Sequence, residues 1–337
     1  MGVGQQTIIE ALKRSETYPH KVSYVKVEET HISWVFLTGI YAYKIKKELT
    51  FGEILDFSTL KLRKNICQKE VLLNKILCHS LYKGVVKIVQ EKYNHKIKIA
   101  ALKDRRHALE YAVKMREIPQ EYRMDNLVML GKVSLETIKR LINILVKFHC
   151  TTRTNAQIKN FGKPKFMKMK IVENFKTLRR LTTIDPKFER TLISFVKNNN
   201  RLFYKRIKEG KIREIHGDLY LKNIFVIKDK FYLYDRIEFN DSLRYADVAE
   251  DVAHLSMDFD RHNRLDLRKY FISNYVEKSK DNDLQKLINF LMCYKACLRV
   301  KVSLFHAEHE KVNKKRIMYI RESKLLLKLA ESYLELL

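Results

Sequence analysis

The sequence contains few of the residues that mark irregular, cross-linked or membrane-embedded chains. Of its 337 residues, 9 are glycine, 4 proline and 1 tryptophan, which excludes collagen-like and low-complexity classes. Its five cysteines, an odd number without a Cys-x-x-Cys pair, argue against a disulfide framework and a zinc site. No apolar run reaches the roughly 18–20 residues that span a bilayer, and the N-terminus lacks the apolar core of a signal peptide. We therefore expect a reduced, cytoplasmic protein without a membrane span.

Acidic residues are also few: 39 Asp and Glu stand against 67 Lys and Arg, for a net charge of +28 and a pI near 9.7. The charge is uneven, because residues 235–260 carry a net charge of −6 and the rest of the chain carries +34. The basic segment 161–213 holds 16 Lys and Arg against 4 Asp and Glu, interleaved with aromatic residues. Such a mixture suits RNA. A solvated helical surface with its aromatics in the core explains it more simply, and we favour that interpretation over a nucleic-acid partner.

The length and the order of the expected elements predict two lobes. With 46% hydrophobic residues, the chain can bury substantial cores. The first part is rich in aromatic and β-branched runs and contains one long helix, whereas the pattern after about residue 116 is mainly helical. We expect an α+β fold with a small β-rich lobe at 1–115 and a larger, mainly helical lobe at 116–337.

Individual elements can be located from their periodicity. Runs at 32–37 and 41–46, joined by a short loop centred on Gly39, predict a hairpin. A helix is expected from Asp56 or Ser58 to about His79, because apolar residues recur there with a period near 3.6. In the second lobe we expect, among others, one continuous helix over 242–260.

One polar motif carries most of the chemical information. His216-Gly217-Asp218 is followed by Asn223, and Asp235 ends an apolar strand 17 residues after Asp218. Phosphoryl transfer requires a carboxylate at the acceptor hydroxyl, and an amide and a second carboxylate that hold Mg²⁺ on the phosphates. We predict Asp218 as the catalytic base, and Asn223 and Asp235 as magnesium ligands. The alternative is a turn that Asp218 and Asn223 close between two strands.

A kinase also needs a lysine on a strand and a glutamate on a helix to orient it. Lys44 lies on the second strand of the hairpin, and Glu70 lies in the following helix. Lys46 shares a strand face with Lys44 and is an alternative, since side chains alternate with a period of 2. We favour Lys44 as the contact to the α- and β-phosphates of ATP.

Both glycine-rich phosphate-binding loops are absent, since the sequence has neither G-x-G-x-x-G nor G-x-x-x-x-G-K-[ST]. The segment before the hairpin offers Thr30 and Ser33 as phosphate contacts in their place. The adenine is expected near Tyr111, Val113 and Met115, through their backbone groups.

Together these motifs resemble the aminoglycoside phosphotransferase-like kinases, the small-molecule branch of the protein-kinase-like fold. The resemblance is strongest to a subgroup that is often fused to a P-loop kinase domain and described as gluconate-kinase-like. It rests on the runs E-T-H-I-S-W-V-F-L-T-G, Y-A-Y-K-I-K-K, E-Y-A-V-K-M-R and H-G-D-L-x-x-x-N-I. It implies ATP and Mg²⁺ as cofactors, a nucleotide-binding lobe at 1–115 and a catalytic and substrate-binding lobe at 116–337. The chain departs from the subgroup at Arg236, where a small residue is usual, and in lacking a Walker motif.

The acceptor is expected to be a small molecule. Only about six residues separate Asp235 from the next helix, so there is no room for the peptide platform of protein kinases. Five polar residues are candidates for substrate binding or for support of the catalytic loop: His216, Glu238, Asp241, Asp247 and Asp251. We expect a phosphotransferase acting on a hydroxyl of a sugar, polyol or aminoglycoside-like acceptor. The alternative is a kinase fold that binds RNA or protein, or phosphorylates them, through segment 161–213.

Overall fold

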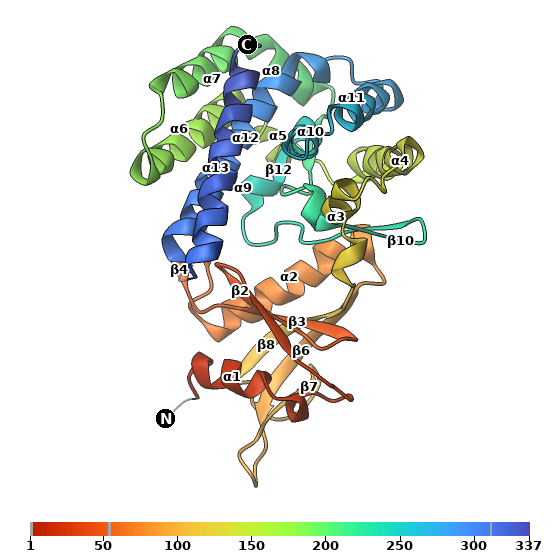
Figure 1. The fold of residues 1–337 in the computed structure, drawn as a ribbon, viewed down its shortest axis with the longest axis vertical. Coiled ribbons are helices and arrows are strands. Elements are labelled where there is room, and N and C mark those ends of the chain that lie inside the picture. Colours follow the sequence, from red (N-terminus) through yellow and green to blue (C-terminus); the bar gives the residue numbers. More distant parts are fainter. Residues whose placement is uncertain (1–2, 53–54, 311) are drawn as a thin grey trace. The chain divides into compact units, whose positions relative to one another are not determined.

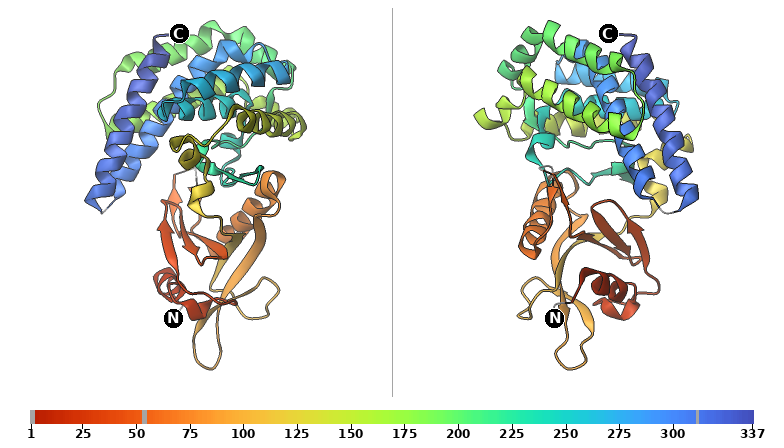
Figure 2. Two further views of the ribbon diagram at one scale, coloured as in Figure 1. Left: turned by 45° about the vertical axis from the view of Figure 1, so that its right-hand side comes forward. Right: turned by 90° about the vertical axis from the view of Figure 1, so that its left-hand side faces the viewer.

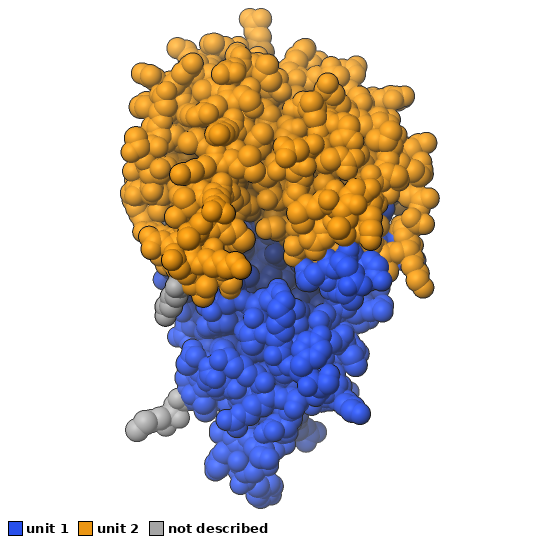
Figure 3. Space-filling view, viewed as in Figure 1, with its two compact units in different colours: residues 1–122, 230–241 blue, residues 123–229, 242–337 orange. Residues whose placement is uncertain are grey.

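The computed structural model describes residues 3–52, 55–310 and 312–337 (Figure 1). The chain divides into two compact units, drawn in different colours in Figure 3. Unit 1 comprises Met1–Tyr122 and Lys230–Asp241, and unit 2 comprises Arg123–Asp229 and Ser242–Leu337. The short segment 230–241, which contains Asp235, therefore belongs to unit 1 although the sequence around it belongs to unit 2.

Unit 1 is built on a six-stranded antiparallel sheet with strand order β1-β2-β3-β8-β6-β7. The helix α2 packs on β6 and β8 (Figure 1). The elements of this unit are α1 (Gln5–Leu12), β1 (Lys26–Glu29), β2 (Ser33–Leu37), β3 (Tyr41–Lys46), β4 (Thr50–Phe51), β5 (Leu55–Asp56), α2 (Leu60–Cys78), β6 (Tyr82–Gln90), β7 (Ile97–Ala101), β8 (Glu110–Arg116) and β11 (Lys230–Leu233), with short 3₁₀ turns at Ser15–Thr17 and Gln120–Tyr122.

Alternation along β3 gives this strand one apolar and one charged face. Tyr43 and Ile45 pack into the core that the sheet forms with α1. Lys44 and Lys46 point to the opposite face, where both reach Glu70 of α2. The predicted hairpin is present as β2 and β3, and Gly39 in its turn has a φ of +87°, which favours glycine.

Unit 2 is mainly helical. Figure 2 shows α12 and α13 running side by side, and α10 packs against α11, α12 and α13. The elements are α3 (Met124–Met129), α4 (Leu135–Thr151), α5 (Ala156–Asn160), α6 (Pro164–Leu181), α7 (Pro186–Asn198), α8 (Asn200–Lys208), β9 (Ile212–Glu214), a 3₁₀ turn (Leu221–Asn223), β10 (Ile224–Ile227), β12 (Tyr245–Asp247), α10 (Ala249–Arg261), α11 (Leu265–Ser279), α12 (Leu284–His309) and α13 (Asn313–Leu334), with α9 (Asp241–Arg244) at the junction of the units.

The expected continuous helix over 242–260 is wrong. The segment is divided into α9, the strand β12 and α10, because Tyr245–Asp247 pairs with β9 in an antiparallel ladder. Helix α10 is buried along most of its length, so the polar side chains that it carries lie inside unit 2. Local periodicity could not reveal this strand, since its partners lie 31 to 35 residues earlier, from Glu214 opposite Tyr245 to Ile212 opposite Asp247.

Two further features bear on the sequence expectations. The five cysteines are free thiols, and four of them are buried. Within the described ranges, every helix is either too short or too polar to traverse a lipid bilayer.

Gly162 provides a test of the packing in unit 2. A methyl group at this position would lie 2.3 Å from Ile212 Cγ1 and 2.9 Å from Ile207 Cγ1. Because Ile212 is buried and cannot move aside freely, we expect Gly162→Ala to lower the free energy of unfolding by about 1–3 kcal/mol. Urea unfolding followed by circular dichroism measures the loss.

Gly4→Ala is the matched control for this substitution, since a methyl group there meets no atom within 4 Å. It should cost no more than about 0.5 kcal/mol, as Gly4 is an N-cap. Equal losses in the two variants would contradict the packing at Gly162.

Candidate active site

Lys44 joins two carboxylates in unit 1. Its Nζ atom lies 3.0 Å from Glu70 Oε1 and 2.6 Å from Asp235 Oδ1. Lys44 lies on β3. Glu70 of α2 and Asp235 of the segment after β11 are 26 and 191 residues away from it in the sequence. The Lys44 side chain is 10% exposed and that of Asp235 is 39% exposed, so this pair is accessible to a ligand.

Lys46 completes the same cluster from a deeper position. Its Nζ atom lies 2.6 Å from Glu70 Oε2 and 2.5 Å from Glu238 Oε1, and its side chain is fully buried. The Glu70 carboxylate is therefore shared between the two lysines. Because Lys46 is sealed in the interior while Lys44 contacts the accessible Asp235, the geometry favours Lys44 for ligand binding and gives Lys46 a structural role.

The charges of the cluster are mutually stabilised. Burial alone would lower the pKa of Lys44, but the attraction of Asp235 and Glu70 raises its pKa well above the ordinary value. Burial would raise the pKa of Glu70, and the two lysines together lower it. For Glu238, burial outweighs the attraction of Lys46 and its pKa is raised.

The backbone around Asp235 is fixed by α2 and β6. Asp235 itself has a φ of +63°, in the left-handed region, and its N–H donates to the Tyr82 hydroxyl at 3.4 Å. The following N–H, of Arg236, donates to Asn74 Oδ1 at 2.8 Å, and the Arg236 side chain is buried. Asn74 was not identified from the sequence, because nothing in the spacing within α2 links it to a segment 162 residues away.

In unit 2 a single carboxylate holds the predicted catalytic loop. Asp251 of α10 accepts the N–H of His216 at 2.8 Å and the N–H of Gly217 at 3.0 Å. His149 of α4 lies behind it, with Nε2 at 3.2 Å from Asp251 Oδ2 and Nδ1 at 2.7 Å from the Tyr275 hydroxyl. Burial would raise the pKa of Asp251, but the hydrogen bond and charge of His149 and the His216 backbone lower it to about 2.

The loop presents Asp218 while fixing the backbone on either side of it. Asn223 Nδ2 donates to the Asp218 carbonyl at 2.9 Å and contacts Asp218 Oδ2 at 3.4 Å. The N–H of Leu221 donates to Asp258 of α10 at 2.7 Å. The Asp218 side chain is 34% exposed. Because the amide nitrogen of Asn223 is committed to Asp218, its Oδ1 atom remains as the ligating atom.

Three aromatic or basic side chains surround Asp218 within unit 2. His254 Nδ1 lies 3.8 Å from Asp218 Oδ1, and the His254 ring stacks on Tyr220 with centroids 5.5 Å apart. The guanidinium of Arg299 lies 4.6 Å from the centroid of the Tyr220 ring, on α12. Burial, together with the charges of Lys295 and Arg299, lowers the pKa of His254 well below its ordinary value, so the imidazole is neutral at pH 7.

The acidic segment 235–260 is neutralised by basic residues from elsewhere. Each of its carboxylates contacts a basic side chain. The pairs are Asp235 with Lys44, Glu238 with Lys46, Asp241 with Lys69, Asp247 with Arg206, Glu250 with Lys170 and Lys295, Asp251 with His149, Asp258 with Arg261, and Asp260 with Arg268. Glu238 and Asp247, considered above as substrate contacts, are thus engaged in ion pairs. Asp241 pairs with Lys69 at 2.8 Å and is 44% exposed.

Thr30 and Ser33, expected to contact phosphates, lie at the turn between β1 and β2. The Thr30 hydroxyl accepts the N–H of Ser33 at 3.0 Å and donates to its carbonyl at 3.1 Å, and the Ser33 side chain is buried. The Thr30 hydroxyl thus closes the β1–β2 turn, whereas the buried Ser33 hydroxyl has no hydrogen-bond partner among the described residues.

The backbone at Tyr111, Val113 and Met115 is likewise occupied, because β8 is paired with β3 on one side and β6 on the other. The N–H of Glu117, directly after β8, also donates to a backbone carbonyl, that of Ile40, at 3.0 Å.

Several residues of the site were missed by sequence reasoning. Asp251, His254 and Asp258 follow one another at spacings of three and four, and so share one face of a buried helix. Such a polar stripe along one face of a helix is a signal that would have found His254 and Asp258. His149 and Arg299 lie on other helices, and no local pattern links them to the loop.

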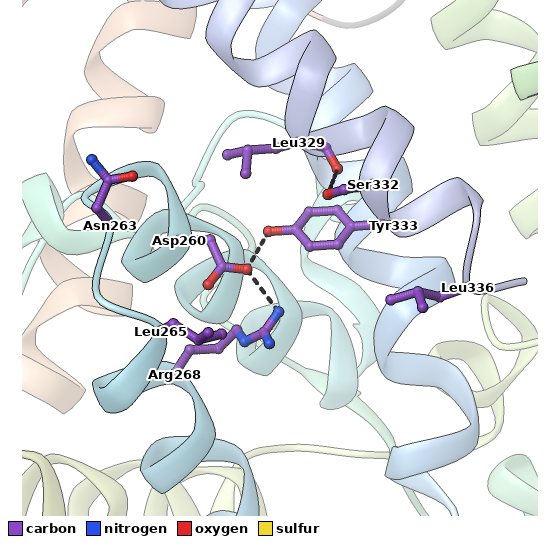
Figure 4. A pocket seen from close by; sticks show the side chains of 8 residues that line it. All are labelled: Asp260, Asn263, Leu265, Arg268, Leu329, Ser332, Tyr333 and Leu336. Atoms are coloured by element: carbon purple, nitrogen blue, oxygen red, sulfur yellow. Dashed lines mark hydrogen bonds and ion pairs between the residues drawn. The ribbon is translucent and has the colours of Figure 1, made fainter.

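A hollow in unit 2 is lined by residues of α10, α11 and α13 and the turn between α10 and α11 (Figure 4). Its volume is about 400 Å³. At its centre the Asp260 carboxylate accepts the Tyr333 hydroxyl at 2.6 Å and Arg268 Nη1 at 2.8 Å. Since this carboxylate is already satisfied and none of the predicted site residues line the hollow, nothing there indicates a ligand.

Comparisons of the sequence with known proteins find relatives without an assigned function. No family model matches the chain. Uncharacterized proteins of Mycobacterium bovis and Mycobacterium tuberculosis are 30% identical over 285 residues, which cover 83% of this chain and 54% of each relative. The chain thus spans about half the length of these relatives.

Two solved structures of kinases superpose on most of the chain. An ethanolamine kinase of Plasmodium vivax matches with a TM-score of 0.52 and 14% identity, covering 91% of this chain and 81% of that one. A choline/ethanolamine kinase family protein of Mesorhizobium loti matches with a TM-score of 0.50 and 10% identity, covering 98% and 99%. The predicted fold class, protein-kinase-like with a β-rich N-terminal part and a helical C-terminal part, is confirmed.

The lowered pKa of Asp251 predicts an acid-sensitive contribution to stability. A carboxylate whose pKa falls from about 3.8 to about 2 on folding stabilises the protein above pH 4 and loses that effect as the pH falls toward 2. The contribution is about 2 kcal/mol. Asp251→Asn should therefore be less stable at pH 7, and it should lose less further stability between pH 4.5 and pH 2 than the wild type. Urea unfolding at a series of pH values measures both effects.

Glu331→Gln, an exposed carboxylate of α13, controls for the loss of one surface charge. Parallel stability–pH curves for wild type and Asp251→Asn would show that Asp251 does not carry this contribution.

Proposed function

We propose that the protein is an ATP- and Mg²⁺-dependent phosphotransferase that transfers the γ-phosphate to a hydroxyl of a small molecule such as a sugar, polyol or aminoglycoside-like compound. The observation that carries this proposal is the contact of Lys44 with both Glu70 and Asp235. A lysine oriented by a helix glutamate beside an accessible aspartate is the arrangement that binds and polarises nucleotide phosphates in protein kinases.

The residues proposed to bind ATP and Mg²⁺ have suitable ligand atoms. Mg²⁺ prefers carboxylate and amide oxygens, and Asp235 and Asn223 Oδ1 are such atoms. Bound Mg²⁺ would neutralise charge that develops on the phosphates. Lys44 would contact the α- and β-phosphates with Glu70 holding it, and adenine would lie near Met115, at the C-terminal end of β8. In this proposal unit 1 carries the nucleotide-binding role assigned to 1–115, together with Asp235.

Asp218 would act on the acceptor. Its carboxylate takes the proton of the acceptor hydroxyl as the oxygen bonds to the γ-phosphorus. The bond from that phosphorus to the β–γ bridging oxygen breaks, and ADP leaves with the bridging oxygen. The contacts from Asp251, Asp258 and Asn223 to the loop support this role, because they fix the backbone around Asp218 before substrate arrives.

The class of acceptor and the subgroup are assigned by analogy with similar proteins. The two solved structures with this fold are named as ethanolamine or choline/ethanolamine kinases, which supports a hydroxyl acceptor of low molecular mass. Membership of the subgroup described as gluconate-kinase-like rests on the sequence motifs. The free thiols are compatible with the cytoplasmic location expected from the sequence.

The alternative, binding or phosphorylation of RNA or protein through segment 161–213, has less support. An RNA surface of this kind needs exposed rings for stacking. Phe175 and Phe203 are buried, and Phe195 stacks on Phe290 of α12. Of the seven aromatic residues in this segment, Tyr204 is the exposed one, at 52%. The segment therefore follows the simpler interpretation, in which aromatics face the core.

Asp218→Asn tests the central claim. A general base contributes about 10²–10⁴-fold to rate, so the variant should transfer γ-phosphate at least 100-fold more slowly than wild type. Transfer of labelled γ-phosphate to a panel of sugars, polyols, aminoglycosides, nucleosides and RNA measures the effect. Asp266→Asn removes an exposed carboxylate of α11 and should transfer normally. Undiminished transfer by Asp218→Asn would refute the proposal.

Substitutions of Lys44 and Lys46 should affect ATP binding and protein stability differently. Lys46→Met leaves Glu238 buried without its cation and should lower the free energy of unfolding by about 3–5 kcal/mol. Lys44→Met should cost less stability, because Glu70 keeps Lys46 and Asp235 is accessible to water, but it should abolish phosphate transfer. Urea unfolding and ATP binding by calorimetry measure the two effects. A stable Lys46→Met variant that fails to bind ATP, beside an active Lys44→Met variant, would reverse the assignment.

A further inference from the structure

Arg299 on α12 has no acceptor for its hydrogen bonds. Its guanidinium lies over the Tyr220 ring at 4.6 Å, and Tyr220 in turn stacks on His254 with an angle of 14° between the rings. Among the residues described, no carboxylate or carbonyl hydrogen-bonds to it, and the side chain is partly accessible to solvent. An arginine carries five N–H donors in a planar fork, and leaving them unpaired in a partly buried place is costly unless a ligand or water satisfies them.

The neighbouring carboxylates cannot serve Arg299, because each is committed elsewhere. Asp251 holds the loop N–H groups and His149, and Asp258 binds the Leu221 N–H and Arg261. Glu250 bridges Lys170 and Lys295. Glu322 contacts Arg261 and Ser303. Asp218, Glu322 and Asp258 attract the guanidinium, but none of them accepts a hydrogen bond from it among the described residues, so its N–H donors stay available to an anionic group beside Asp218.

We propose that Arg299 binds an anionic group of the phosphate acceptor, which is therefore a hydroxyl compound that also carries a carboxylate or a phosphate. This inference rests on the proposed function, since it takes Asp218 as the base. The acceptor hydroxyl must lie within hydrogen-bond reach of that base, so groups around Asp218 in unit 2 meet the acceptor. The proposed nucleotide-phosphate contact Lys44, with Glu70 and Asp235, belongs to unit 1.

The stack on Tyr220 suits Arg299 to this task. Tyr220 lies two residues after Asp218, so one loop positions both the base and the anion-binding guanidinium. A guanidinium that is held flat against a ring loses little further freedom when it binds, and its fork matches a carboxylate or a phosphate with two parallel hydrogen bonds. His254, neutral beneath the ring, adds no competing charge. A neutral acceptor would leave the fork unpaired, and a cationic acceptor would be repelled.

Acceptors of matched carbon number test the inference on the full chain. Labelled γ-phosphate transfer is measured to a sugar alcohol, an aldonic acid, a sugar phosphate and an amino sugar. Wild type should favour the acid or the phosphate over the neutral alcohol by at least tenfold in kcat/KM, and the amino sugar should be poorest. The acid and phosphate arms distinguish the two anionic groups.

Variants of Arg299 assign the preference to this side chain. Arg299→Met should raise KM for the preferred anionic acceptor at least tenfold, with a smaller change in kcat and no change for the neutral alcohol. Arg299→Lys, which keeps the charge but lacks the fork, should lie between. Lys301→Met is the matched control: Lys301 lies two residues further along α12, turned by about 200°, and should leave the preference unchanged.

Two results would overturn the inference while the proposed function stands. The first is equal transfer to neutral and anionic acceptors. The second is an Arg299→Met variant that slows transfer to every acceptor and acceptor-free ATP hydrolysis alike, since the arginine would then serve the transferred phosphoryl group. Calorimetric binding of the aldonic acid and the sugar phosphate without ATP separates the remaining cases. If the wild type binds these compounds but transfers phosphate to no acceptor, and Arg299→Met abolishes the binding, the proposed function is refuted and an anion site is supported. Absence of both binding and transfer would refute both.

Discussion

The interaction on which unit 1 depends is the sharing of one buried carboxylate, Glu70, between two lysines. Removing a carboxylate from water costs several kcal/mol, about as much as two well-placed cations can return. Lys44 and Lys46 lie on the same face of β3 and meet the two oxygens of Glu70 separately, so the strand and α2 cannot shift without breaking both contacts. The deeper lysine makes the pair rigid. The outer lysine is then held in place beside Asp235, where an accessible carboxylate permits exchange with a ligand.

Unit 2 also contains a buried carboxylate, but backbone N–H groups and a histidine satisfy it instead of lysines. This carboxylate on α10, Asp251, is satisfied by two backbone N–H groups and by His149 rather than by a lysine or an arginine. Its function is to hold backbone, so that Asp218 can remain partly exposed on a loop that does not move. In both units the accessible acid is the one whose surroundings are fixed by a buried acid from a neighbouring helix. Such preorganisation is what phosphoryl transfer requires, because the protein contributes mainly position and charge.

The sequence predicted the parts of this arrangement that local patterns encode. The hairpin and its period of two place Lys44 and Lys46 on one face, and the motif around Asp218 has a recognisable spacing. It did not predict which strand is central: the run 110–115 reads as a strand, but only the sheet order shows that its backbone is paired on both sides. The acidic segment was misleading for the same reason. Its eight carboxylates give the segment a net charge of −6, whereas most of their basic partners come from other elements that no spacing connects to them.

Once these pairs are counted, the site has a different character from the one that its local composition suggests. Acids cluster in sequence near Asp235 and on α10, yet they are paired in space, and next to Asp218 the guanidinium of Arg299 stacks on Tyr220 with its hydrogen-bond donors unused among the described residues. The fold is shared with proteins named for ethanolamine and choline, both cations, but a fold does not fix the acceptor. Acceptor choice depends on the few side chains that face the base. Here they are a tyrosine, a neutral histidine and an arginine, a set that offers hydrogen bonds and positive charge and no spare carboxylate for a cationic substrate.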